Sequence, residues 1–169
     1  MAALGRSERA RVRRAQAGSA SDLEALFREH WPRAYRAAYL VVHDSAAAED
    51  IAQEAFLAAV RALDRFDRSR PFGPWLHRIA VNRAIDWARA RTMRAESEAH
   101  EVAAPETQLH DDALLAELAA LEPDHRAVIV LRYLLEYTPG EIAELLELPR
   151  GTVNSRLRRG LDHLKERLE

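Results

Sequence analysis

The amino-acid sequence predicts an all-α protein: two small helical domains joined by a flexible acidic linker, with a helix-turn-helix in the second domain. Apolar residues recur at spacings of three and four in two long stretches, and no segment alternates apolar and polar residues as a half-buried strand does. Between these stretches lies an aperiodic, acidic segment. We therefore predict domains at residues 12–92 and 111–169 and a linker at residues 93–110.

Three helices account for the first predicted domain. They are expected at about residues 21–42, 46–64 and 75–91. Ser21, with Glu24 three residues later, has the spacing of a capping box and predicts where the first helix begins. Two prolines and a glycine between Phe66 and Pro74 predict a loop before the third helix. The stretch before Ser21 is expected to be a basic arm.

Four helices are predicted in the second domain. They are expected around residues 114–118, 128–135, 138–146 and 150–168. The third has a strong start signal, with Thr138 at the cap, Pro139 in the first turn and Glu141 completing a capping box. A tight turn at residues 147–149 separates it from the last helix. The usual residue at the first position of this turn is glycine, and a left-handed Glu147 costs about 1 kcal/mol.

The composition excludes several classes of function. The chain has 169 residues, of which 48% are hydrophobic and 31% charged, and it contains no cysteine. Disulfides, iron–sulfur clusters and thiolate zinc sites are therefore excluded. The seven histidines form no HExxH motif and no pair four residues apart, and no phosphate-binding glycine loop or catalytic serine motif is present. We expect no active site, no metal site and no cofactor.

Charge and hydropathy predict a cytoplasmic protein. No apolar run approaches the roughly 18 residues that a membrane-spanning helix needs. Five arginines lie within the first 21 residues, but no apolar segment follows them, so this arm is not a signal peptide. The net charge of −2 is spread as a basic arm, a nearly neutral first domain, and an acidic linker and second domain. No block is basic enough to bind DNA tightly by charge alone.

The last two predicted helices have the layout of a helix-turn-helix. Val153 and Leu157 are spaced to seat the last helix on the core. This orientation leaves a polar set near the exposed side of its first turns, where such helices enter a major groove. The set comprises Thr152, Asn154, Ser155, Arg158 and Arg159. Arginine pairs with guanine and asparagine with adenine, so this surface suits base reading. The alternative is a plain antiparallel helix pair with solvated arginines.

Four stretches of the sequence together resemble a bacterial extracytoplasmic-function (ECF) RNA polymerase sigma factor. The first two are VRRAQAGSASDLEALFREHWPRAYRAAY and AEDIAQEAFLAAVRALDRF. The others are PFGPWLHRIAVNRAIDWAR and LEPDHRAVIVLRYLLEYTPGEIAELLELPRGTVNSRLRRG. They cover roughly residues 12–91 and 114–168, in the family's order and spacing. The resemblance implies that the first domain corresponds to sigma region 2 and the second to region 4.

The resemblance implies a polymerase-binding face on the second helix. Burying its apolar stripe turns Asp50, Gln53, Glu54 and Leu57 outward. In the family, this region docks on the clamp helices of the largest subunit of core RNA polymerase. A leucine among carboxylates suits a partner surface, and the alternative is an acidic solvated surface with one stray leucine.

The resemblance also implies that the loop at residues 66–74 and the following helix face promoter DNA. Arginines and aromatic rings can hold an unstacked base without a duplex groove. In the family, the loop captures a flipped base of the minus-ten element and the helix contacts adjoining DNA. The residues that match are Arg68, Arg70, Phe72, Asn82 and Arg83. Trp75 and Trp87 share an apolar stripe and are expected in the core.

The sequence is thus interpreted as a promoter-specificity subunit rather than an enzyme. It is expected to bind core RNA polymerase, to read the minus-thirty-five element through the helix-turn-helix and to melt the minus-ten element. A cognate anti-sigma factor is an implied partner, no membrane insertion is expected, and the free protein is expected to be a monomer. The rival interpretations are a helix-turn-helix repressor or activator that does not dock on polymerase, and a helical adaptor without DNA binding.

Overall fold

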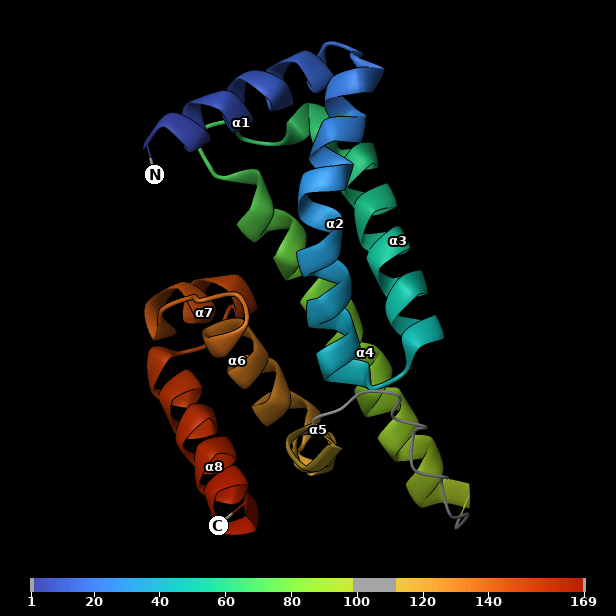
Figure 1. Ribbon diagram of the computed structural model, residues 1–169, viewed down its shortest axis with the longest axis vertical. Helices are drawn as coiled ribbons and strands as arrows, with labels where there is room; N and C mark the ends of the chain where they lie inside the picture. Colours follow the sequence, from blue (N-terminus) through green and yellow to red (C-terminus); the bar gives the residue numbers. More distant parts are fainter. Residues whose placement is uncertain (1, 99–111, 169) are drawn as a thin grey trace.

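A computed structural model describes residues 2–98 and 112–168 of the chain, which are helical throughout apart from short connections (Figure 1). The helices are α1 (Ala2–Gln16), α2 (Ala20–Val42), α3 (Ser45–Ala62), α4 (Phe72–Glu98), α5 (Asp112–Ala120), α6 (Pro123–Tyr133), α7 (Pro139–Leu146) and α8 (Arg150–Leu168), with a 3-10 turn η1 (Leu63–Arg65) after α3. No strand occurs in these two ranges, which agrees with the all-α prediction. None of the described helices is long and apolar enough to cross a membrane.

The helices α2, α3 and α4 pack side by side, and α1 crosses one end of them (Figure 1). Leu26 of α2, Phe56 of α3 and Leu76 of α4 are buried in one apolar cluster between these helices. The break between α2 and α3 is well capped: the N–H of His43 donates to the Tyr39 carbonyl (2.7 Å), and the Asp44 carboxylate accepts from the N–H of Ala47 (2.9 Å). These caps confirm the predicted break.

The N-terminal segment is a helix rather than an arm. Val12 and Ala15 of α1 are buried, and they pack in the same cluster as Leu63 and Phe66. The predicted cap of the next helix was displaced by two residues: Ser19, not Ser21, is the N-cap of α2, and its hydroxyl accepts from the N–H of Asp22. A short connection therefore joins α1 to α2, which fixes the basic segment against the domain.

The helix α4 is longer at both ends than predicted. It begins at Phe72, inside the predicted loop, because Phe72 and Leu76 continue its buried side. It ends at Glu98, so the first six residues of the predicted linker are helical. The rest of the predicted linker, residues 99–110, lies outside the described part of the chain.

The second group of helices carries the predicted helix-turn-helix in α7 and α8. Thr138 and Glu141 form the capping box that the sequence predicts: the Glu141 N–H donates to the Thr138 hydroxyl, and the Thr138 N–H donates to the Glu141 carboxylate (2.7 Å). Glu147 has a φ of 55°, which confirms the left-handed turn residue. Gly160 allows α8 to approach α6, since a Cβ there would lie 2.6 Å from Ile129 Cδ1.

The two groups of helices pack against each other through α2 and α4 on one side and α5, α6 and α7 on the other (Figure 1). Val41 of α2 and Ile85 of α4 share an apolar cluster with Val128 and Leu131 of α6. Arg126 of α6, only 8% exposed, joins the groups through hydrogen bonds. Its guanidinium donates to the carbonyls of Leu118 (2.9 Å), Ala119 and Leu121 (2.7 Å) at the end of α5, and to the Val41 carbonyl at the end of α2.

We expect Arg126→Met to destabilise the protein more than any exposed arginine substitution. Burial lowers the pKa of Arg126 to about 10, so the side chain is still charged at neutral pH and satisfies carbonyls at two helix ends. Methionine fills a similar volume but leaves those buried acceptors without a donor. The free energy of unfolding, measured with urea, should fall by about 2–4 kcal/mol. Arg167→Met, at an exposed position, is the control, and equal losses from the two would contradict this role.

Candidate nucleic-acid and protein interfaces

The first turns of α8 display most of the predicted base-reading residues. Val153 and Leu157 are buried and seat the helix, as predicted. Asn154, Arg158 and Arg159 are exposed, whereas Thr152 and Ser155 are half-buried. All five lie within the N-terminal half of α8, the part of the helix that the prediction places in the major groove.

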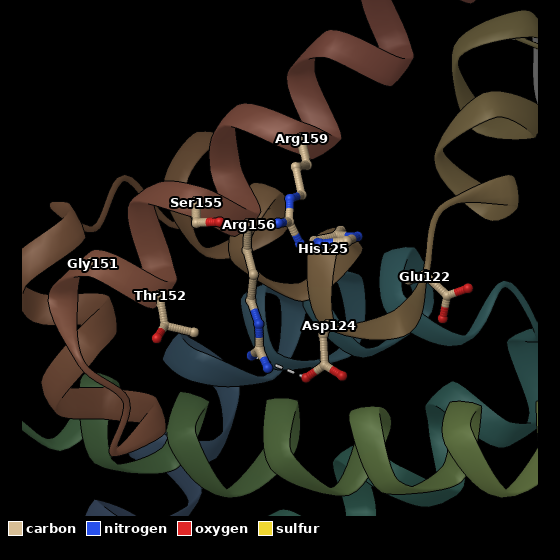
Figure 2. A pocket seen from close by; sticks show the side chains of 8 residues that line it. All are labelled: Glu122, Asp124, His125, Gly151, Thr152, Ser155, Arg156 and Arg159. Atoms are coloured by element: carbon tan, nitrogen blue, oxygen red, sulfur yellow. Dashed lines mark ion pairs between the residues drawn. The ribbon is translucent and has the colours of Figure 1, made fainter.

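An open hollow of about 470 Å³ lies between the starts of α6 and α8 (Figure 2). Thr152, Ser155 and Arg159 line it from α8, and Glu122, Asp124 and His125 line it from the other side. Arg156 points across it to the Asp124 carboxylate, with 3.1 Å between Nη1 and Oδ1 (Figure 2). Arg156 is thereby engaged within the protein, whereas its neighbours Arg158 and Arg159 are exposed.

The same Asp124 carboxylate links the helix-turn-helix to α4. Arg89 of α4 donates to both Asp124 oxygens, at 2.6 Å and 2.8 Å. Arg78 of α4 pairs with Glu147, the left-handed residue of the helix-turn-helix turn. The imidazole of His77 lies 2.7 Å from the Tyr137 hydroxyl. Sequence reasoning did not find these contacts, since each residue on its own resembles an ordinary surface or core position.

The residues predicted to hold the minus-ten element divide into two sets. Arg68 and Arg70 are exposed on the connection between η1 and α4, where the Asp67 carboxylate accepts from the N–H of Ser69 (2.9 Å) and shapes the turn. Asn82 is half-buried, and Arg83 is exposed but pairs with Glu54 of α3 (2.7 Å). Arg68 and Arg70 precede the start of α4, and Asn82 and Arg83 lie in its first half.

Phe72 is a core residue in the structure, contrary to the prediction that it contacts DNA. It is 2% exposed, and its ring packs against those of His30, Phe66 and Trp75. The helix starts at Phe72 and turns the ring into the core. The ring therefore packs beneath the loop and is not available to stack on a base. Trp75 and Trp87 are half-buried against the two apolar clusters, in agreement with the expected core positions.

The predicted polymerase-binding residues share one exposed face of α3. Asp50, Gln53, Glu54 and Leu57 are all exposed, and Leu57 retains 53% of its surface. Beside them runs an apolar groove between α2 and α3 of about 420 Å³. Its lining residues are Ala20, Leu23, Glu24, Phe27, Gln53, Phe56, Leu57 and Val60. Phe27 is 39% exposed and adds α2 to this surface.

Among the described residues, Glu8, Glu29 and His30 form a group that could offer three ligand atoms to a metal ion. Each is engaged in an ion pair between α1 and α2. Glu8 Oε1 lies 2.9 Å from His30 Nε2, and Glu29 pairs with Arg11. His30 lowers the pKa of Glu8 through a hydrogen bond. The group is accounted for as a link that holds α1 on α2.

Acid should weaken the fold through the buried imidazoles of His43 and His77. Burial lowers the pKa of each to about 4. Arg126 faces His43, while His30 and Arg33 face His77 and further disfavour its charge. The unfolded chain takes up these protons near pH 6.5 and the folded chain does not. Stability is therefore complete above about pH 7 and is lost progressively as the pH falls from 6.5 towards 4.

This prediction is checked by urea unfolding at pH 7.5, 6 and 5. Each imidazole contributes up to about 3 kcal/mol of the acid-induced loss. His77→Gln keeps a hydrogen-bonding group beside Tyr137 and removes one titrating group. The variant should lose less stability than the wild type between pH 7.5 and 5. Identical pH dependence of the two proteins would contradict the assignment to His77.

Known protein families match both groups of helices. Residues 26–94 match the family Sigma-70 region 2, and residues 111–164 match Sigma-70, region 4. The chain is 33% identical to the ECF RNA polymerase sigma factor SigW of Bacillus subtilis, with 93% of this chain and 92% of SigW aligned. It is also 33% identical to the RNA polymerase sigma factor CarQ of Myxococcus xanthus, over 89% of this chain and 91% of CarQ.

Solved structures show the same fold. CnrH, solved in complex with the cytosolic domain of CnrY, superposes with a TM-score of 0.73 and 29% identity, over 95% of this chain and 96% of CnrH. The sigma factor RpoE of Bartonella quintana, solved in complex with the anti-sigma factor NepR, has a TM-score of 0.71 at 21% identity, over 87% of this chain and 96% of RpoE. The chain belongs to the family of ECF RNA polymerase sigma factors.

Proposed function

We propose that this protein binds core RNA polymerase and directs it to promoters, reading the minus-thirty-five element with α8 and holding the melted minus-ten element beside the η1–α4 connection. The observation that carries the proposal is the presence, in one chain, of an exposed base-reading set on α8 and an exposed mixed face on α3. A DNA-binding repressor needs only the first of these surfaces. The protein itself performs no chemistry in this proposal, because phosphodiester synthesis belongs to the polymerase.

The minus-thirty-five element is assigned to α8 because its exposed residues match the requirements of major-groove reading. Arg158 and Arg159 are able to form bidentate bonds to guanine, and Asn154 to adenine. The half-buried Thr152 and Ser155 lie at the helix start, where hydroxyl groups reach the phosphate backbone. Because the chain has a net charge of −2, general attraction to the DNA phosphates contributes little. The affinity for promoter DNA must therefore come from these few contacts and from the polymerase.

Core polymerase is assigned to the α3 face because this surface combines charge with exposed apolar area. Leu57, Phe27 and Val60 are large apolar residues left exposed around one groove. The exposed carboxylates of Asp50 and Glu54 lie on the same helix, α3, and suit a basic partner surface. An apolar centre with a polar rim is typical of a specific protein interface.

The packed arrangement of the two helix groups must open for this function. The two promoter elements lie about 25 base pairs apart, or about 85 Å along the duplex at 3.4 Å per base pair. Arg78, within the first two turns of α4, contacts Glu147 in the helix-turn-helix, and the whole of α4 spans only about 40 Å. The two DNA-contacting surfaces are therefore too close together to engage both elements at once.

Opening is expected when polymerase binds. Because the chain has no cysteine, Arg36→Cys in α2 and Asp162→Cys in α8 provide unique sites for a pair of fluorescent dyes. Energy transfer between the dyes should be high in the free protein and should fall when core polymerase is added. A pair within one group, such as Arg36→Cys with Asp64→Cys, is the control and should not change. Unchanged transfer for the first pair would contradict the opening.

A protein partner of the anti-sigma class is also proposed. CnrH and RpoE, which share this fold, were each solved with a bound partner protein. The chain contains no cysteine with which to sense oxidants itself. We infer that the free chain is a cytoplasmic monomer whose availability to polymerase is controlled by such a partner.

Transcription from selected promoters tests the proposed function. Genomic fragments bound by the reconstituted holoenzyme are recovered, placed on linear templates and transcribed with core polymerase in the presence or absence of this protein. If the protein is a promoter-specificity subunit, core polymerase gives initiated transcripts only in the reactions that contain this protein. A repressor or activator without polymerase docking binds fragments alone and gives no transcript, and a helical adaptor selects no fragments.

A further inference from the structure

The helix α1 is hydrogen-bonded to the connection between α3 and α4 at several points. The Gln16 side-chain amide donates to the carbonyls of Leu63 (2.8 Å) and Phe66 (3.1 Å). In the middle of α1, the Arg9 guanidinium donates to the Ser69 carbonyl (3.1 Å). These contacts join residues 47 to 60 positions apart in the sequence. They follow the connection from the end of α3 to the exposed loop.

The loop has few other interactions to fix its shape. Residues 67–71 are all exposed. Within the loop, the Asp67 side chain accepts from Ser69, and the Arg70 N–H donates to the Asp67 carbonyl (3.0 Å). These bonds form a local turn but do not tie it to the domain. Its position relative to α4 is therefore set by the contacts from α1 and by the buried rings of Phe66 and Phe72 at its two ends.

Gln16 occupies the most consequential of these positions. Its amide bridges both ends of the η1 turn, at the point where the chain leaves α3. Its contacts are half-buried, whereas the Arg9 contact is exposed to competing water. Val12 and Ala15, in the same part of α1 as Gln16, are buried in the core. They fix the helix in place, so the Gln16 amide is held on a rigid backbone.

We propose that Gln16 is a positioning residue for the minus-ten element: it holds the loop at residues 66–71 in the conformation in which Arg68 and Arg70 meet the melted strand. This inference rests on the proposed function for its DNA-binding consequence. The segment matched to Sigma-70 region 2 begins at residue 26, so α1 lies outside it. In this protein the N-terminal helix thus acts on DNA through the loop that it supports.

The test compares Gln16→Met, which has similar length but no donor, with Gln16→Lys, which restores an N–H donor on a stem of comparable reach. The full-length variants are first studied free in solution by amide hydrogen exchange. Exchange at residues 66–70 should rise in Gln16→Met and return towards wild type in Gln16→Lys. Ile51→Val, a shortened core side chain on α3, controls for loss of stability unrelated to the loop.

The second measurement uses holoenzyme and a single-stranded oligonucleotide that carries the minus-ten sequence of a promoter selected with the wild type. Gln16→Met should bind it about fivefold to tenfold more weakly, the effect of losing one or two hydrogen bonds that order the site. Gln16→Lys should recover most of this loss. Binding of the minus-thirty-five duplex and of core polymerase should not change.

Three outcomes overturn the inference. These are wild-type exchange at residues 66–70 in Gln16→Met, unaltered oligonucleotide binding by that variant, and an equal loss of binding in Ile51→Val. If the wild-type holoenzyme selects no promoter, the proposed function fails instead, and the exchange experiment on the free protein still decides whether Gln16 holds the loop.

Discussion

Glu54→Arg combined with Leu57→Asp on α3 should abolish binding to core RNA polymerase. The first change reverses a charge on the exposed face of α3, and the second places a carboxylate in the apolar groove that Leu57 lines. An arginine against a basic partner surface and an unpaired carboxylate buried in an apolar contact together cost several kcal/mol, which lowers affinity by at least a hundredfold. Co-purification with core polymerase at moderate salt measures this effect.

Both substitutions lie on the surface, so the variant should remain folded. Glu54 loses its ion pair with Arg83, but this exposed pair contributes little to stability. The matched control is Glu166→Arg with Leu168→Asp at the end of α8, which makes the same chemical changes at an exposed glutamate and an exposed leucine. The control should bind polymerase normally. Retained binding by the α3 variant would show that the polymerase-binding face lies elsewhere.

The sequence predicted the elements whose signals are local. The capping box at Thr138, the break at residues 43–45 and the left-handed Glu147 are each determined by a few neighbouring residues, and the structure confirms all three. The inward positions of Val153 and Leu157 follow from helical spacing and were also correct. The exposure of the α8 polar set then follows from the same periodicity.

The errors arose where tertiary contacts decide the structure. α1 contains five arginines and few large apolar residues, so its pattern resembles a solvated arm. Only the packing of Val12 and Ala15 in one cluster with Leu63 and Phe66 reveals its role. Phe72 was assigned to DNA because it is an aromatic residue in the loop that, by the family resemblance, faces promoter DNA. Its ring turns inward because α4 begins one turn earlier than predicted. Residues of the same helix face can be buried or exposed, depending on what covers them.

The packing of the two helix groups could not be predicted from the periodicity. Val41 and Ile85 belong to ordinary apolar stripes, and no spacing rule distinguishes a stripe that closes on its own group from one that also contacts another. The role of the buried Arg126, whose four acceptors lie at the ends of α5 and α2, could not be predicted from the sequence either. The long-range partners of a single charged residue can be identified only once the fold is known.

Arg158→Ala and Arg159→Ala, made singly, should each weaken binding of holoenzyme to duplex DNA that carries the minus-thirty-five element. A bidentate arginine–guanine contact is worth about 1–3 kcal/mol of discrimination, or roughly fivefold to more than a hundredfold in affinity. Both side chains are exposed on the N-terminal half of α8, whereas Arg156 is occupied by Asp124. Neither change should affect binding to core polymerase, since α3 lies in the other helix group.

The salt and sequence dependence of this binding separates base reading from simple attraction to phosphate. Arg167→Ala removes the same charge from the far end of α8, where the side chain contacts Glu117, and serves as the control. A lost phosphate contact weakens binding to all sequences equally and lowers the salt slope, whereas a lost base contact relaxes preference at one position of the element. We expect the second behaviour for at least one of Arg158 and Arg159 and neither for Arg167. If both variants lose affinity without any change in sequence preference, Arg158 and Arg159 contact the backbone only, and the residues of α8 that read the element are Asn154 and its neighbours at the start of the helix.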